Sequence, residues 1–363
     1  MLHRILIIFG TALCLNAVAV TYTKDQINHI IHNDRVETAS KTFVRGFFIA
    51  KNPKEYIDDF ILNKKSTLEP LVIEYQLYQL LSEVAYQPKQ QFLQDFVNAM
   101  QQYKHQAFRT HDEGSMLVAV YNLQAKAKGV VNIWLVAESL NYYTNWFNNN
   151  PIATVSRLKS TSNTLSTPQW LGLKSSISNI SPDDHIKLVD YLLDTNNISG
   201  LDKFISHYSL LTANKDLVQM AILHLDKSNS EYILRHLSNY FATDFVVAQL
   251  LYSVENGKNQ AFALSLMSPY VDSYNSVNKL LFQYLSHDKF ATSAAFALAN
   301  TRDTKILHQL ASAYVNSQSD IEKQQIIFTL KLNKLPESEV ILTDIIQHGT
   351  TNIWLNSFKG VVQ

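Results

Sequence analysis

The residues best suited to shared chemistry are two histidines and two carboxylates in one short stretch. His111, Asp112 and Glu113 are consecutive, and His105 lies shortly before them. Imidazoles and carboxylates bind metals and act as general acids or bases. Consecutive side chains on a helix diverge, whereas a turn, which Gly114 favours here, would let them converge. These four residues are a candidate acid–base or metal cluster, and the alternative is an ordinary polar connection.

A second pair of imidazoles, His29 and His32, has the i, i+3 spacing of neighbours on one helix face. The pair lacks the Glu and the third ligand of zinc-peptidase motifs, so an exposed pair is the simpler interpretation. The sequence also lacks a nucleophile elbow, a phosphate-binding glycine loop and a calcium loop. We therefore assign no catalytic residue and expect no metal or cofactor.

A dense aromatic run is the leading candidate for ligand binding. It consists of Tyr142, Tyr143, Trp146 and Phe147. At 3.6 residues per turn these four rings cannot all face one side of a helix, so at least one is expected to face outward. Exposed aromatic rings favour contacts with peptides or glycans. The alternative is that the rings are buried in the core.

The composition predicts long helices joined by short polar connections. The chain has only 9 Gly and 8 Pro in 363 residues, and these residue types punctuate turns and strands. Apolar residues recur at helical spacing, as in Leu71, Tyr75, Tyr78 and Leu81. The predicted fold class is all-α.

The composition changes between two parts of the chain. Residues 20–150 are expected to form an N-terminal helical region rich in aromatics. Residues 151–180 are rich in Ser and Thr, which is typical of a loop or linker. This segment is either a hinge between two domains or a connection within one array. Residues 181–363 form the second region.

A regular pattern begins at Ser181. This residue, with Pro182 and the two acids that follow, has the composition of a helix start: a capping Ser, Pro at the first position and acids in the first turn. Predicted helices of 10 to 14 residues then alternate with short polar breaks, and comparable helix centres recur after 28 to 30 residues. A fixed period in this range is typical of stacked helical repeats.

One part of this region resembles a repeat of the HEAT type. Residues 294–303 form a small-residue helix that ends in a turn with an Asp, and the Leu-rich stretch 306–310 follows. The resemblance implies a right-handed α-solenoid of antiparallel helical hairpins over residues 181–363, preceded by the helical N-terminal region. Other arrays of helical hairpins have a similar pattern.

The N-terminus has the three parts of a secretory signal. Residues 1–4 form a short segment that carries a basic Arg4, and residues 5–15 form an apolar run. The small residues at positions 17 and 19 suit a signal peptidase. We expect cleavage after Ala19 and a periplasmic or secreted protein. The apolar run is shorter than the ~20 residues of a membrane anchor. Cys14 is the only cysteine, so the mature chain is expected to lack disulfides.

The charge balance excludes some classes of partner. Basic and acidic residues number 31 each, charged residues are 17% of the chain, and no basic stripe is visible, so nucleic-acid binding is not expected. No segment after the signal is apolar enough to span a membrane.

These observations predict an exported helical-repeat protein that binds or scaffolds a protein, or an envelope glycan or other envelope macromolecule, through one face of its repeats. The alternative is a hydrolase-type enzyme with a site around residues 105–113. The oligomeric state is not predicted.

Overall fold

The computed structural model describes residues 19–64 and 68–348, and the chain divides into two compact units. Unit 1 comprises the described residues up to Tyr142 together with Ser166–Leu173, and unit 2 comprises Tyr143–Leu165 and the described residues from Lys174 onward. The predicted signal lies, apart from Ala19, outside the described residues.

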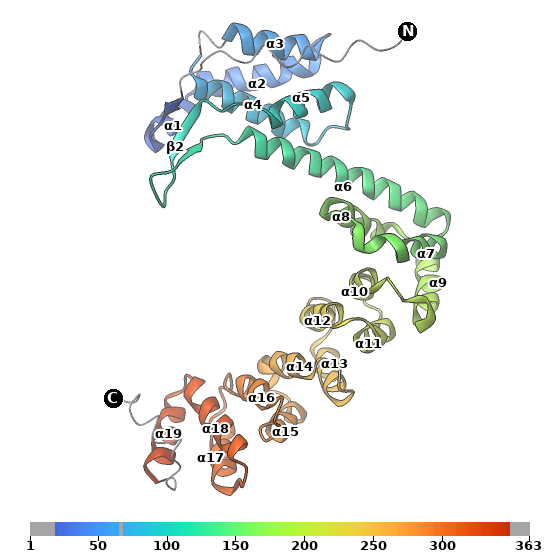
Figure 1. Ribbon diagram of the computed structural model, residues 1–363, viewed down its shortest axis with the longest axis vertical. Coiled ribbons are helices and arrows are strands. Elements are labelled where there is room, and N and C mark those ends of the chain that lie inside the picture. Colours follow the sequence, from blue (N-terminus) through green and yellow to red (C-terminus); the bar gives the residue numbers. More distant parts are fainter. Residues whose placement is uncertain (1–18, 65–67, 349–363) are drawn as a thin grey trace. The chain divides into compact units, whose positions relative to one another are not determined.

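The predicted all-α class is confirmed. The described residues form 19 α-helices and three short strands (Figure 1). The longest helix, α6, runs from Leu123 to Asn149. Within the ranges that the structure describes, no helix combines the length and the apolarity needed to cross a membrane.

Unit 1 is built from helices and one small sheet. Its first five helices are α1 (Lys24–Ile31), α2 (Asp34–Ile49), α3 (Pro53–Lys64), α4 (Pro70–Val84) and α5 (Gln91–Gln101). Most of α6 and of α8 (Thr167–Ser176) completes the unit. Its main core consists of buried side chains from α2 to α6, including Phe47, Leu77, Val97 and Trp134.

The sheet of unit 1 has no counterpart in the sequence-based expectations. Its strands are β1 (Val20–Thr21), β2 (Ala107–Thr110) and β3 (Leu117–Ala119). β1 pairs in parallel with β2, which pairs antiparallel with β3. Strands of two to four residues are too short for an alternating pattern to identify them.

The Ser/Thr-rich segment 151–180, which its composition predicts to be a loop or linker, is instead largely helical. It holds α7 (Pro151–Thr161) and the whole of α8. Asn150 caps α7 by accepting a hydrogen bond from the backbone N–H of Ala153, and Pro151 occupies the first turn. The hydroxyls of Thr154 and Ser156 donate to carbonyls four residues earlier, so these polar side chains are accommodated within the helix.

Unit 2 consists of helices only in the part that the structure describes. After α7 its helices are α9 (Pro182–Leu193), α10 (Asp202–Leu211), α11 (Lys215–His224), α12 (Lys227–His236), α13 (Thr243–Glu255), α14 (Gln260–Leu266), α15 (Asn275–Tyr284), α16 (Ala291–Leu298), α17 (Thr304–Asn316), α18 (Asp320–Leu332) and α19 (Pro336–His348). The predicted start at Ser181 is confirmed, because its hydroxyl accepts a hydrogen bond from the N–H of Asp184.

The helices of unit 2 contact one another in a regular order. From α10 to α18, each even-numbered helix packs against the next even-numbered one, and it also packs against a sequence neighbour of odd number. Some odd-numbered helices also pack against the next odd-numbered one: α9 contacts α11, α11 contacts α13, and α17 contacts α19. In Figure 1 the even-numbered and odd-numbered helices of this part form two neighbouring rows.

Polar contacts recur at similar spacing in unit 2, mostly between residues at helix ends and in the connections between helices. The hydroxyl of Tyr274 donates to Asp244 over 2.7 Å, and the N–H of Arg302 donates to Asp272 over 2.9 Å. The buried amide of Asn333 donates to the carbonyls of Ala299 (3.0 Å) and Thr301 (2.9 Å). The joined residues lie 30 to 34 positions apart, close to the period of the sequence pattern.

Candidate functional site

The four residues of the candidate acid–base cluster lie at and near the β2–β3 hairpin. His105 precedes β2, and its Nε2 accepts a hydrogen bond from the backbone N–H of Leu123 over 3.0 Å. This contact caps the start of α6. Burial lowers the pKa of His105, so the imidazole is held neutral in the state that can accept this bond.

The other three residues of that cluster lie in the hairpin loop. His111 Nδ1 accepts from the backbone N–H of Glu113 (3.2 Å), and Asp112 pairs with Arg109 (3.1 Å) at the surface. Glu113 is exposed. No group of three potential metal ligands occurs among the described residues, which include the pair His29 and His32. The structure thus gives His105 a capping contact and shows no shared site for the four, and an enzymatic role stays a prediction.

The aromatic run lies near the C-terminal end of α6. Tyr143 and Phe147 are buried, with 6% and 1% of their surfaces exposed. Phe147 stacks on Phe204 of α10, with ring centres 6.3 Å apart. Tyr142 is 47% exposed, and half-buried Trp146 carries the guanidinium of Arg157 4.7 Å from its ring centre. Two of the four rings are therefore core, and Tyr142 and Trp146 are the ones that a ligand could touch.

A polar groove between α15 and α17 is a site that the sequence analysis missed. Its volume is about 540 Å³. α15 contributes Asn275, Asn278, Lys279, Phe282 and Gln283, and α17 contributes Gln309, Ser312, Ala313 and Asn316. Both sets follow helical i, i+3, i+4, i+7 spacing, so each helix presents one stripe to the groove. We call this site the amide groove.

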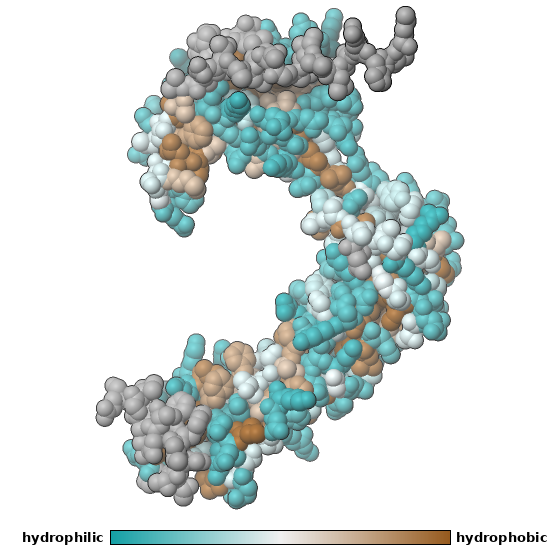
Figure 2. Space-filling model, in the orientation of Figure 1, coloured by the Kyte–Doolittle hydropathy of each residue, from teal (hydrophilic) through white to brown (hydrophobic). Residues whose placement is uncertain are grey.

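The amide groove offers polar groups that the protein itself does not use. Four side-chain amides have no hydrogen-bond partner among the described residues, those of Asn275, Asn278, Gln283 and Gln309. The ammonium of Lys279 has no acidic partner among these residues either. Each amide holds a donor and an acceptor, the same two functions as a peptide group. Around this site the view in Figure 2 shows a largely hydrophilic surface over α10 to α18, with hydrophobic residues in small separate patches.

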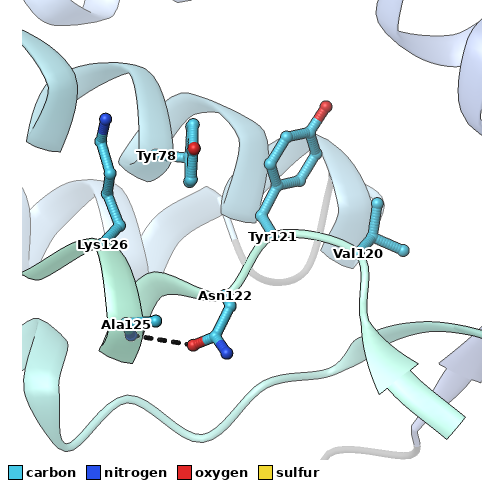
Figure 3. Close-up of a pocket in the computed structure, with 6 residues that line it drawn as sticks. All are labelled: Tyr78, Val120, Tyr121, Asn122, Ala125 and Lys126. Atoms are coloured by element: carbon cyan, nitrogen blue, oxygen red, sulfur yellow. Dashed lines mark hydrogen bonds between the residues drawn. The ribbon is translucent and has the colours of Figure 1, made fainter. Parts of the chain in front are cut away.

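A second pocket lies in unit 1, at the start of α6, with a volume of about 320 Å³ (Figure 3). It is lined by Tyr78 of α4, by Val120, Tyr121 and Asn122 after β3, and by Ala125 and Lys126 of α6. Figure 3 shows the side chains of Tyr121 and Lys126 extending in the same direction with Tyr78 between them, whereas Asn122 turns the other way and caps Ala125. We call this site the tyrosine pocket.

Tyr121 of the tyrosine pocket packs against two further tyrosine rings. The ring of Tyr121 lies 5.5 Å from that of Tyr75 and 5.2 Å from that of Tyr78. Burial, with a smaller effect of Tyr75 and Tyr78, raises the pKa of Tyr121, so its hydroxyl stays protonated at any physiological pH. The ammonium of Lys126 lies 5.0 Å from the ring centre of Tyr78, within cation–π range.

Comparisons with known proteins do not identify the chain. No family model matches the sequence. No curated protein sequence and no solved structure is significantly similar to it.

Proposed function

We propose that this protein is an exported helical-repeat protein that binds a polypeptide segment through the amide groove. The regular contacts between alternate helices support the interpretation of unit 2 as a HEAT-like, right-handed α-solenoid from residue 181 onward. Contacts recurring after 30 to 34 residues support it as well. Export rests on the secretory signal predicted for residues 1–19.

The observation that carries this function is the set of unpaired amides in the groove. An extended polypeptide leaves N–H and C=O groups without partners, and side-chain amides can satisfy both. The lining residues of α15 cover a length of roughly 12 Å at 1.5 Å per residue. At about 3.3 Å per residue, this length accommodates about four residues of an extended chain. Lys279 would favour an acidic residue in that segment, and Phe282 offers an apolar contact.

The proposal is tested with an unfolded polypeptide as the probe. Reduced, carboxymethylated α-lactalbumin, labelled with a fluorophore, is titrated with the chain from Val20 onward, and binding is followed by anisotropy. We expect saturable binding, and none to native α-lactalbumin. The double variant Asn278→Ala/Gln309→Ala removes one amide from each side of the groove. It is expected to weaken binding about tenfold, because each lost hydrogen bond contributes about 0.5–1.5 kcal/mol.

The matched control is Gln318→Ala, which removes an exposed amide that lies outside the groove. It should leave the affinity unchanged. Equal binding by the double variant and the unaltered protein would contradict the proposed site. Binding of soluble peptidoglycan fragments in place of the unfolded polypeptide would instead assign the groove to an envelope glycan.

A further inference from the structure

The tyrosine pocket belongs to unit 1, and it has its own chemistry. The ammonium of Lys126 has no acidic partner among the described residues. The hydroxyls of Tyr75, Tyr78 and Tyr121 likewise have no hydrogen-bond partner in the part of the chain that the structure describes. The pocket therefore offers one cation and the phenol hydroxyls of Tyr78 and Tyr121 beside aromatic faces, and Tyr75 packs against Tyr121.

From this arrangement we infer that the tyrosine pocket binds one acidic sugar unit, a pyranose ring that carries a carboxylate. The C–H face of a pyranose can pack on the ring of Tyr78 or Tyr121, while its hydroxyl groups exchange hydrogen bonds with the phenols. Lys126 supplies the charge for the carboxylate, in a charge-assisted hydrogen bond stronger than a neutral one.

The size and polarity of the pocket favour a sugar over the C-terminus of a peptide. At about 320 Å³ the pocket is at the small end of ligand sites, which suits a single ring. The side chain of an apolar or aromatic residue would fill this space but leave the phenol hydroxyls without partners, which is costly when water is displaced. A sugar carries a hydroxyl on most of its ring carbons, and these groups can form hydrogen bonds with the phenol hydroxyls.

The inference is tested by calorimetric titration with D-glucuronate, D-glucose and N-acetyl-L-phenylalanine at one ionic strength. D-Glucuronate is expected to bind at least tenfold more tightly than D-glucose. Lys126→Met keeps most of the side-chain length and removes the charge. This variant should lose the tenfold preference and retain the affinity for D-glucose, which also shows that the pocket remains folded.

Lys128→Met is the matched control, because Lys128 is an exposed lysine on the same helix and does not line the pocket. It should change neither affinity. The inference is overturned if N-acetyl-L-phenylalanine binds more tightly than D-glucuronate, if Lys126→Met keeps the preference, or if neither sugar binds. None of these outcomes depends on the amide groove, so this inference and the proposed function can fail separately.

Discussion

Gly172→Ala is expected to destabilise unit 1 by about 2 kcal/mol. A Cβ atom at this position would lie 2.5 Å from Cβ of Ser139, 2.6 Å from the carbonyl oxygen of Val136 and 2.7 Å from the backbone nitrogen of Leu140. Two of these atoms belong to the backbone of α6, so α8 must move away from α6. Overpacking of this kind costs up to about 3 kcal/mol, and the better helix propensity of Ala offsets about 1 kcal/mol.

The control for this prediction is Gly129→Ala in α6. A Cβ atom there has nothing within 4 Å, so only the gain in helix propensity remains, at most about 1 kcal/mol. Urea denaturation followed by tryptophan fluorescence measures both variants, since Trp134 and Trp170 lie in unit 1. If the two substitutions shift the free energy of unfolding in the same direction, the close approach of α8 to α6 is not as described.

The second large effect concerns Glu74, a wholly buried carboxyl group on α4. Its Oε1 accepts hydrogen bonds from the backbone N–H groups of Gln106 (2.6 Å) and Ala107 (3.2 Å). Its Oε2 has no partner among the described residues. Burial raises the pKa of Glu74 from 4.5 to about 7, and these two hydrogen bonds act in the opposite direction. The carboxyl group thus ties α4 to the beginning of β2.

This raised pKa makes stability depend on pH. Between about pH 4.5 and 7 the folded protein holds the Glu74 proton more tightly than the unfolded chain does. The corresponding stabilisation is complete below pH 4.5 and is lost as the pH rises through 7. It amounts to about 3 kcal/mol, since one pKa unit corresponds to 1.36 kcal/mol.

The measurement compares the free energy of urea unfolding of the unaltered protein and of Glu74→Gln at pH 4.5 and pH 8. Gln cannot ionise, so the difference between the two proteins should change by about 3 kcal/mol across this range, in favour of Gln at high pH. Other titrating groups, such as His105, are common to both proteins and cancel. A constant difference would show that Glu74 titrates near its ordinary pKa.

A further variant, Glu74→Leu, separates the hydrogen bonds from the charge. It leaves the N–H groups of Gln106 and Ala107 without an acceptor and, because neither Leu nor Gln ionises, it should be less stable than Glu74→Gln by about 3 kcal/mol at both pH values. The residue next to Glu74, Tyr75, contacts Tyr121, which follows β3. The same variant is therefore expected to disturb the tyrosine pocket.

The sequence predicted the starts of several helices because capping is a local interaction. The cap at Ser181 involves residues only three positions apart, as does the cap at Asn214 at the start of α11. Gly257, in the connection between α13 and α14, has a φ of +71°, a conformation that favours glycine. For the segment 151–180 the prediction of a loop or linker was wrong. Ser and Thr disfavour helices in isolation, but here their hydroxyls donate hydrogen bonds within the helix.

The candidate sites were less predictable. The amide groove has a signal in the sequence, namely amide residues at helical spacing around Asn278 and again around Gln309. Such a stripe does not reveal which helix faces it. Glu74 could have been noticed as the one charged residue on the apolar face that includes Leu71 and Leu77. For the aromatic run, helical geometry predicted only that the four rings diverge.

By itself, the sequence determined the helical class and many helix boundaries, because these depend on propensities, caps and apolar periods within a few residues. It also determined that comparable helices recur after about 30 residues in the second half of the chain. The tertiary structure alone decided that His105 caps α6 and that Tyr78 and Tyr121 meet beside Lys126. Such meetings depend on which helices pack together, and packing is set by the whole core rather than by neighbours along the chain.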